Sequence, residues 1–206
     1  MMKRFALLFC VIVAVVGSLF LPSWAIIGSV SSWFSWSTIS LPALQAVFGW
    51  PFFIALLGCK FFMGSSASLL LFCFRRLPLV FSSVTLAQRS LLQYIIFPLF
   101  AIILFTTHSV GHQVWWYSLH WLVPIALYFA KDSLYVRALA ASYVAHAVGS
   151  CVWLYTGQVT VEQWQLIAYL VPFERILFAA GMVISVHVFT YLRLVIIDAI
   201  RRVVPV

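Results

Sequence analysis

Long apolar stretches, separated by short segments that hold most of the charges, constrain this chain more than any other feature. A helix that crosses a bilayer needs about 20 mainly apolar residues. Hydrophobic residues make up 65% of the 206 positions and charged residues only 8%, whereas a soluble domain carries about 25% charged residues. A soluble globule of this size has too much exterior to hide so much apolar surface. The composition therefore predicts an all-α integral membrane protein.

The apolar pattern predicts one polytopic membrane domain over residues 1–206, a transmembrane helical bundle with about six crossings. The expected crossings are 5–27, 42–74, 91–106, 113–130, 138–156 and 172–197. The first has an alternative interpretation as a cleaved signal peptide, since Ser23-Trp24-Ala25 is a passable cleavage site. Its apolar stretch exceeds the usual signal-peptide core of about 7–15 residues, which favours retention.

The basic residues predict the orientation, because short cytoplasmic loops carry an excess of Lys and Arg. Lys3 and Arg4 place the N-terminus in the cytoplasm, and the tail from Arg193 places the C-terminus there too. The segments 28–41 and 107–112 contain no Lys or Arg, so they are expected outside. We therefore expect a multi-pass protein of the cytoplasmic (inner) membrane.

The assignment of successive loops to opposite sides of the membrane requires 42–74 to make one net crossing. A hairpin of two crossings there would place the basic C-terminal tail outside. A straight helix of that length would span about 50 Å, against about 30 Å of hydrocarbon. We therefore expect the segment to tilt or to break near Gly58 to Gly64. The last apolar run is also too long, and Pro172 predicts a break. Residues 161–171 before it are expected to form a short interfacial helix or a partial entry into the membrane.

The formal net charge of +8 raises nucleic acid as a partner. The basic residues lie at the ends of apolar runs, however, and form no stripe with interleaved polar contacts. This distribution is typical of charges that set membrane topology. The lipid bilayer, rather than nucleic acid, is the expected partner.

Glu174 and Arg175 are the leading candidates for function, because charges within hydrocarbon cost about 2.5–3.5 kcal/mol each on insertion scales. Adjacent helical residues point about 100° apart, so each is expected to find a partner on another helix. Two interpretations stay open. The pair contacts a ligand or another helix, or it marks a helix start near the headgroups with Glu174 favoured by the helix dipole.

Residues 138–156 contain two adjacent rows with a spacing of four. Small residues at 141, 145 and 149 form one row and allow close helix packing. Ser142, His146 and Ser150 form the other row and are expected to point into the bundle. There they line a cavity or form hydrogen bonds between helices.

His120 lies in the expected helix 113–130, four residues before Pro124, whose ring frees a backbone carbonyl one turn earlier. It is either a packed polar residue or part of a pocket. Trp33 and Trp36 lie in the charge-free segment 28–41. An aromatic belt is their ordinary interpretation, and a lid over a ligand is the alternative.

Signals for catalysis, metals and cofactors are poor. The four cysteines show no CxxC or Cys/His ligand spacing. Gly64-Ser65-Ser66-Ala67 is similar to the serine motif of rhomboid proteases, but His187 lacks the small, Gly-rich surroundings of their catalytic histidine. The chain has no HExxH and no P-loop. We expect no catalytic residue, metal or cofactor.

The layout resembles the substrate-binding S-components of energy-coupling-factor vitamin transporters. The similar segments are 42–58 (PALQAVFGWPFFIALLG) and 145–150 (AHAVGS). The resemblance implies binding of a vitamin-like molecule near the outer side and association with a membrane partner and ATPase subunits. The family's small-residue motif in the first helix is absent, since Ala6 and Ala14 are eight apart with Cys10 between. That departure puts partner docking in doubt.

The sequence therefore predicts a binding or uptake subunit for a small solute, with ligand candidates Trp33, Trp36, His120, Ser142, His146, Glu174 and Arg175. The alternative is a non-catalytic membrane structural or assembly protein without a ligand, in which the polar residues only join helices. An intramembrane enzyme is the third hypothesis.

Overall fold

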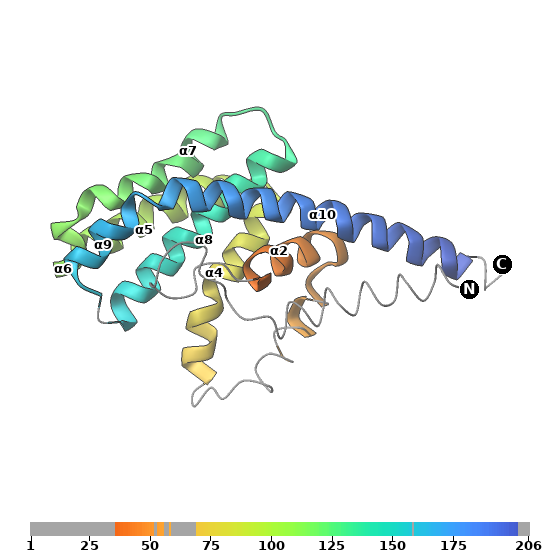
Figure 1. Cartoon of the computed structure of the whole chain (residues 1–206), viewed down its shortest axis with the longest axis horizontal. Helices are drawn as coiled ribbons and strands as arrows, with labels where there is room; N and C mark the ends of the chain where they lie inside the picture. The colour runs from red at the N-terminus through yellow and green to blue at the C-terminus, as the bar shows by residue number, and fades with distance from the viewer. Residues whose placement is uncertain (1–35, 52, 56–57, 59–68, 158, 202–206) are drawn as a thin grey trace. The chain divides into compact units, whose positions relative to one another are not determined.

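The computed structural model describes residues 36–51, 53–55, 58, 69–157 and 159–201. These ranges are predominantly helical and contain no strand, which confirms the all-α prediction for this part of the chain (Figure 1). In chain order the elements are α2 (Trp36–Phe48), α4 (Leu69–Ala87), η1 (Leu92–Ile96), α5 (Phe97–Thr107), α6 (Ser109–Gln113), η2 (Trp115–Trp121), α7 (Leu122–Tyr128), α8 (Leu134–Thr156), α9 (Val161–Ala168) and α10 (Val171–Arg201). Of these, η1 is a π-helix and η2 a 3-10 helix.

The described residues fall into two compact units. Unit 1 holds α2 and the part of α10 from Gly181 onward. Unit 2 holds α4 to α9 and the start of α10 as far as Ala180. The single membrane domain over 1–206 stays a prediction.

In unit 1, α2 is mostly buried and ends at a glycine. Gly49 has φ +87°, a left-handed conformation that glycine adopts without steric cost. Near this end, Arg193 Nη1 donates a hydrogen bond to the Val47 carbonyl at 3.0 Å, which satisfies a carbonyl of the last helical turn. We expected a break in 42–74 near Gly58 to Gly64. The described break lies at Gly49, and residues 59–68 lie outside the described ranges.

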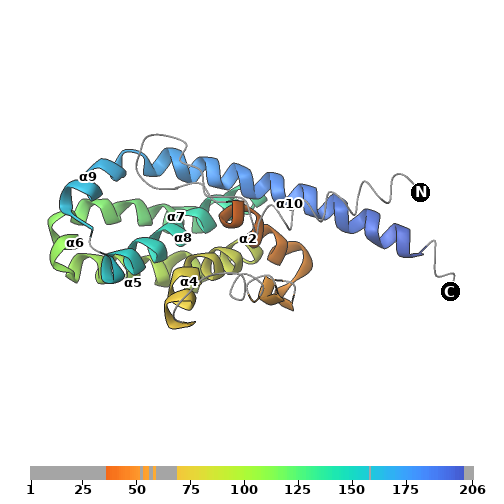
Figure 2. The same ribbon diagram turned by 60° about the horizontal axis from the view of Figure 1, so that its bottom comes forward.

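Unit 2 is built around α8, which lies among α4, α5 and α7 (Figures 1 and 2). The most extensive packing between described elements is that of α4 on α8. Ala141 and Ala145 are buried, and a Cβ added to Gly149 would lie 3.4 Å from Pro78 Cγ of α4. Gly149 thus lets the two helices approach closely, which is the close packing expected of the small-residue row.

Local signals fix the ends of the later helices. Ser133 accepts a hydrogen bond from the Val136 amide and begins α8 four residues earlier than expected. Thr160 forms a capping box with Gln163 at the start of α9. The short helix expected within 161–171 is present as α9. The break lies at Tyr169 and Leu170, between α9 and α10, and Pro172 lies in the first turn of α10.

Two expected helices differ from the prediction. Residues 113–130 form no continuous α-helix: the 3-10 helix η2 precedes α7, with Pro124 in the first turn of α7, where its missing N–H is tolerated. The apolar run expected to end at 74 continues as α4 to Ala87, so Arg76 lies within a helix rather than after one. Which helices cross a membrane stays a prediction.

Two helices of the described part are long and apolar enough to cross a membrane: α8, with 23 residues, and Val171–Val195 of α10, with 25. At 1.5 Å per residue these lengths reach about 35 Å, more than the hydrocarbon thickness of about 30 Å. The other described apolar helices are shorter: Ser37–Phe48, Arg76–Ala87 and Leu92–Thr107. These lengths support membrane association.

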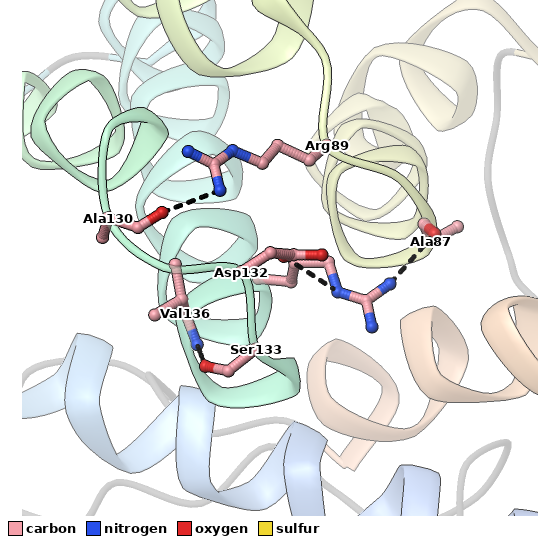
Figure 3. Close-up of polar contacts among 7 residues, drawn as sticks. Ala87, Arg89, Ala130, Asp132, Ser133 and Val136 are labelled. Carbon is pink, nitrogen blue, oxygen red and sulfur yellow. Dashed lines mark hydrogen bonds and ion pairs between the residues drawn. The ribbon is translucent and has the colours of Figure 1, made fainter.

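The connection between α7 and α8 is held by two arginines from different parts of unit 2 (Figure 3). Arg89 Nη1 donates to the Ala130 carbonyl at 2.8 Å. Arg137 Nη1 donates to the Ala87 carbonyl at 3.3 Å, and its Nε lies 3.6 Å from the Asp132 carboxylate. These basic residues, which the sequence assigns to the cytoplasmic side, also fix the fold there.

Candidate functional site

A tyrosine–histidine hydrogen bond joins η2 to α8. Tyr117 Oη lies 2.8 Å from His146 Nε2, and the two rings are 5.7 Å apart between centroids. His120 Nδ1 lies 2.9 Å from the Tyr117 carbonyl, so this nitrogen carries the proton and donates. His146, expected to point into the bundle, therefore does so and forms a bond between elements.

Tyr117 is also the centre of a buried aromatic cluster of four rings that brings three elements together. Its ring lies 5.5 Å from that of Phe105 in α5, 6.2 Å from Trp121 and 4.7 Å from Trp164 in α9. The contacts include stacked and edge-to-face arrangements, which aromatic pairs prefer. All four side chains are almost fully buried. The cluster fixes η2 against α5 and α9.

An ion pair lies in the first turn of α10, in the same unit. Arg175 Nη2 is 3.1 Å from Glu174 Oε2, and the two side chains are 8% and 16% exposed. Arg175 Nη1 donates a long hydrogen bond of 3.4 Å to the Ser142 carbonyl of α8. We expected each of these residues to find a partner on another helix. Arg175 does so at the Ser142 carbonyl of α8, whereas the ion pair joins Glu174 to its neighbour Arg175. Long side chains can curve toward one another across the 100° between their Cβ directions.

Within the described part of the chain, four buried polar atoms of these residues have no hydrogen-bond partner: Ser142 Oγ, Trp121 Nε1, Trp164 Nε1 and Arg175 Nε. Contacts described above connect their residues into one group. Trp121 and Trp164 pack on Tyr117, which forms a hydrogen bond with His146. Ser142 lies one turn from His146 on α8, and Arg175 donates a hydrogen bond to the Ser142 carbonyl. We call this group, with Glu174, the α8–α10 cluster.

Five of the seven predicted ligand residues lie in or beside this cluster: Ser142, His146, Glu174 and Arg175 within it, and His120 beside it through the Tyr117 carbonyl. Trp36 begins α2 in unit 1, and Trp33 lies outside the described residues.

The sequence missed three members of the cluster. Tyr117 lies near an expected outer end, where an aromatic belt is the default interpretation, and Trp121 and Trp164 lie in apolar runs that gave no separate signal. One weak signal could have distinguished these residues from a belt at the membrane surface. Tyr117 and Trp121 are four residues apart, a spacing that places both on one face of a helix. Their burial depends on α9 folding back, which a local pattern does not show.

Metal binding finds no support in the described ranges, where no three His, Cys, Asp or Glu side chains gather closely enough to hold an ion. Cys151 is a buried free thiol whose Sγ lies 3.5 Å from the Ala101 carbonyl. His108 caps α6 by accepting a hydrogen bond from the Val110 amide. Cys151 and His108 thus have structural roles.

The chain matches no protein-family model, no curated protein and no solved structure. The likeness to vitamin-transporter S-components therefore rests on the layout of the sequence and on the two short segments that resemble that family.

Proposed function

We propose that this chain is a multi-pass membrane protein, with about six crossings, that binds a small solute at the α8–α10 cluster and serves as the binding subunit of an uptake system. The apolar composition and the lengths of α8 and α10 support membrane residence. Polar and charged groups within such a bundle are rare and usually functional. The cluster concentrates them on elements that are far apart in the sequence.

The observation that carries the proposal is the set of four unpartnered buried atoms. In folded proteins, about 90% or more of buried polar groups form a hydrogen bond. Each unsatisfied group costs roughly 1–3 kcal/mol. Tyr117 and His146 satisfy each other, whereas these four atoms find no partner within the described part of the chain. A bound solute that supplies the missing partners accounts for the pattern.

Uptake would need an energy source outside this chain, because the sequence has no P-loop or other recognisable nucleotide site. The resemblance to S-components supports a membrane partner with ATPase subunits as that source. In this scheme the chain binds the solute, and the partner drives its movement.

The test is thermal unfolding of the purified full chain in detergent, with a panel of vitamins, nucleobases and amino acids. A ligand at about 100 times its Kd stabilises a protein by about 2.7 kcal/mol. We expect at least one compound to raise the midpoint, and Arg175→Met to abolish that rise. The matched control is Arg193→Met in unit 1, which should keep the rise. If no compound shifts the midpoint, the proposal is wrong.

A membrane structural protein is the second candidate, and one observation favours it. Tyr117 and His146 satisfy each other across η2 and α8, as expected of polar residues that only join helices. Under this alternative, His146→Ala lowers the unfolding midpoint but no compound raises it. Co-purification of an ATPase complex with the native chain would favour the uptake subunit.

A further inference from the structure

We infer that the solute bound at the α8–α10 cluster is an uncharged ring compound that presents hydrogen-bond acceptors. This inference rests on the proposed function and assigns the chemical class of its ligand. It follows from three properties of the cluster: the kind of atoms left unpartnered, the balance of charge and the nature of the surrounding side chains.

The unpartnered atoms are chiefly donors. Trp121 Nε1, Trp164 Nε1 and Arg175 Nε each carry a hydrogen and have no lone pair to offer. The fourth atom, Ser142 Oγ, both donates and accepts. A solute that supplies hydrogens to this set would leave the three N–H groups unsatisfied, whereas carbonyl oxygens or ring nitrogens would satisfy them. The missing partner is therefore rich in acceptors.

The charge in the cluster is already balanced. Arg175 is the cation of this group, and Glu174 compensates it at 3.1 Å. A carboxylate bound at Arg175 Nε would lie beside the carboxylate of Glu174, and an ammonium group would lie beside the guanidinium. Either one would add an uncompensated charge in a site where charged groups are mostly removed from water, which costs several kcal/mol. An uncharged solute avoids this cost.

The side chains that carry or flank the donors are flat and aromatic. Phe105 and Tyr117 are stacked with an angle of 24° between their planes, and the Trp121 and Trp164 rings meet Phe105 edge-on at 5.2 Å each. Sites of this kind hold small organic molecules by apolar and aromatic contact, while a few polar groups fix the orientation. A planar ring would pack against the aromatic side chains, and acceptors on its edge would bind the unpartnered N–H groups.

The probes are four ring compounds of similar size. The compound 1,3-dimethyluracil is neutral with acceptors only, benzoate is anionic, benzylamine is cationic, and toluene is neutral without acceptors. The measurement is the unfolding midpoint of the full chain in detergent with each probe, followed by its Kd from titration calorimetry. We expect 1,3-dimethyluracil to raise the midpoint by about 5–10 °C at about 100 times its Kd. The other three should give smaller shifts.

Serine variants connect the binding to the cluster. Ser142→Ala should weaken the binding of 1,3-dimethyluracil by roughly tenfold, which is the loss of one hydrogen bond of about 1.4 kcal/mol. Without a probe the same variant should keep or raise the midpoint, because it removes an unpartnered hydroxyl. Ser83→Ala is the matched control. Its buried hydroxyl bonds the Leu79 carbonyl at 2.7 Å, so the change should leave the Kd for the probe unaltered.

The outcomes separate the two proposals. A larger shift with benzoate or benzylamine that Arg175→Met abolishes would keep the solute-binding function and overturn the uncharged class. An equal shift with toluene would overturn the need for acceptors. If none of the four probes and no compound of the wider panel shifts the midpoint, water satisfies these atoms and both proposals fail. An unchanged Kd in Ser142→Ala would also overturn the assignment of the ligand to this cluster.

Discussion

Replacing Glu174 by Gln should destabilise the protein by about 3 kcal/mol, because it leaves the Arg175 charge without its partner. Exposed ion pairs contribute only about 0.2–1 kcal/mol. Breaking a buried pair by removing one partner costs about 3–5 kcal/mol. The two side chains are 8% and 16% exposed, so the lower end of the buried range applies. For a chain of this length the expected fall in the unfolding midpoint is roughly 6–12 °C.

The assay is thermal and denaturant unfolding in detergent, with two companion variants. Glu162→Gln is the matched control, since Glu162 also lies in the first turn of a helix but is exposed. It measures what an exposed first-turn carboxylate gains from the helix dipole, together with its hydrogen bonds to the Thr160 side chain and to the backbone. The double variant Glu174→Gln with Arg175→Met removes both charges and should recover most of the lost stability.

Two results would refute this reasoning. If Glu174→Gln loses no more stability than Glu162→Gln, then Glu174 is solvated and acts only through the helix dipole. If the double variant is less stable than Glu174→Gln alone, then Arg175 stabilises the fold through its bond to the Ser142 carbonyl rather than through its pairing with Glu174. Unchanged denaturant slopes across the set would show that the variants unfold in the same way.

Three further changes test the packing and the helix ends by the same unfolding assay. Tyr117→Phe should cost about 1–3 kcal/mol, because it leaves His146 Nε2 buried without its 2.8 Å partner; a stability equal to wild type would mean that water replaces the hydroxyl. Gly111→Ala should cost more than about 3 kcal/mol, since the new Cβ would lie 1.9 Å from the Phe105 carbonyl oxygen, and a well-folded variant of full stability would contradict that packing. Thr160→Ala should cost about 1 kcal/mol through loss of the N-cap of α9, whereas Thr160→Asp should retain the cap.

The sequence predicts those parts of the fold that depend on local signals. The α8 helix follows from a continuous apolar run. Close helix packing follows from the small residues at 141, 145 and 149, and Gly149 packs in this way against Pro78 of α4. The short helix before Pro172 follows from the excess length of the last run and from the restriction that proline places on a helix. Each of these depends on residues within a few turns of one another.

The site was predicted only in part, because its assembly depends on contacts between distant segments. His146 and Arg175 stand out as costly polar residues in apolar runs, which is a local property. That Tyr117 bonds His146 depends on the 3-10 helix η2 lying against α8, and neither the helix type nor the pairing has a signature in the sequence. The break at Gly49 was also missed, since several glycines between 49 and 64 offered similar signals.

The π-helix Leu92–Ile96 has a consequence for how this chain tolerates changes in length. It continues directly into α5 as one helical run from Leu91 to Thr107. A π-turn is equivalent to one residue inserted into an α-helix, and it absorbs that residue by widening a single turn. Deleting one residue there would return the turn to α geometry and leave every later side chain of α5 on its present face. The same deletion within α5 would rotate that face by about 100°. Leu92–Ile96 is thus the place in this run where a chain could lose a residue at the lowest structural cost.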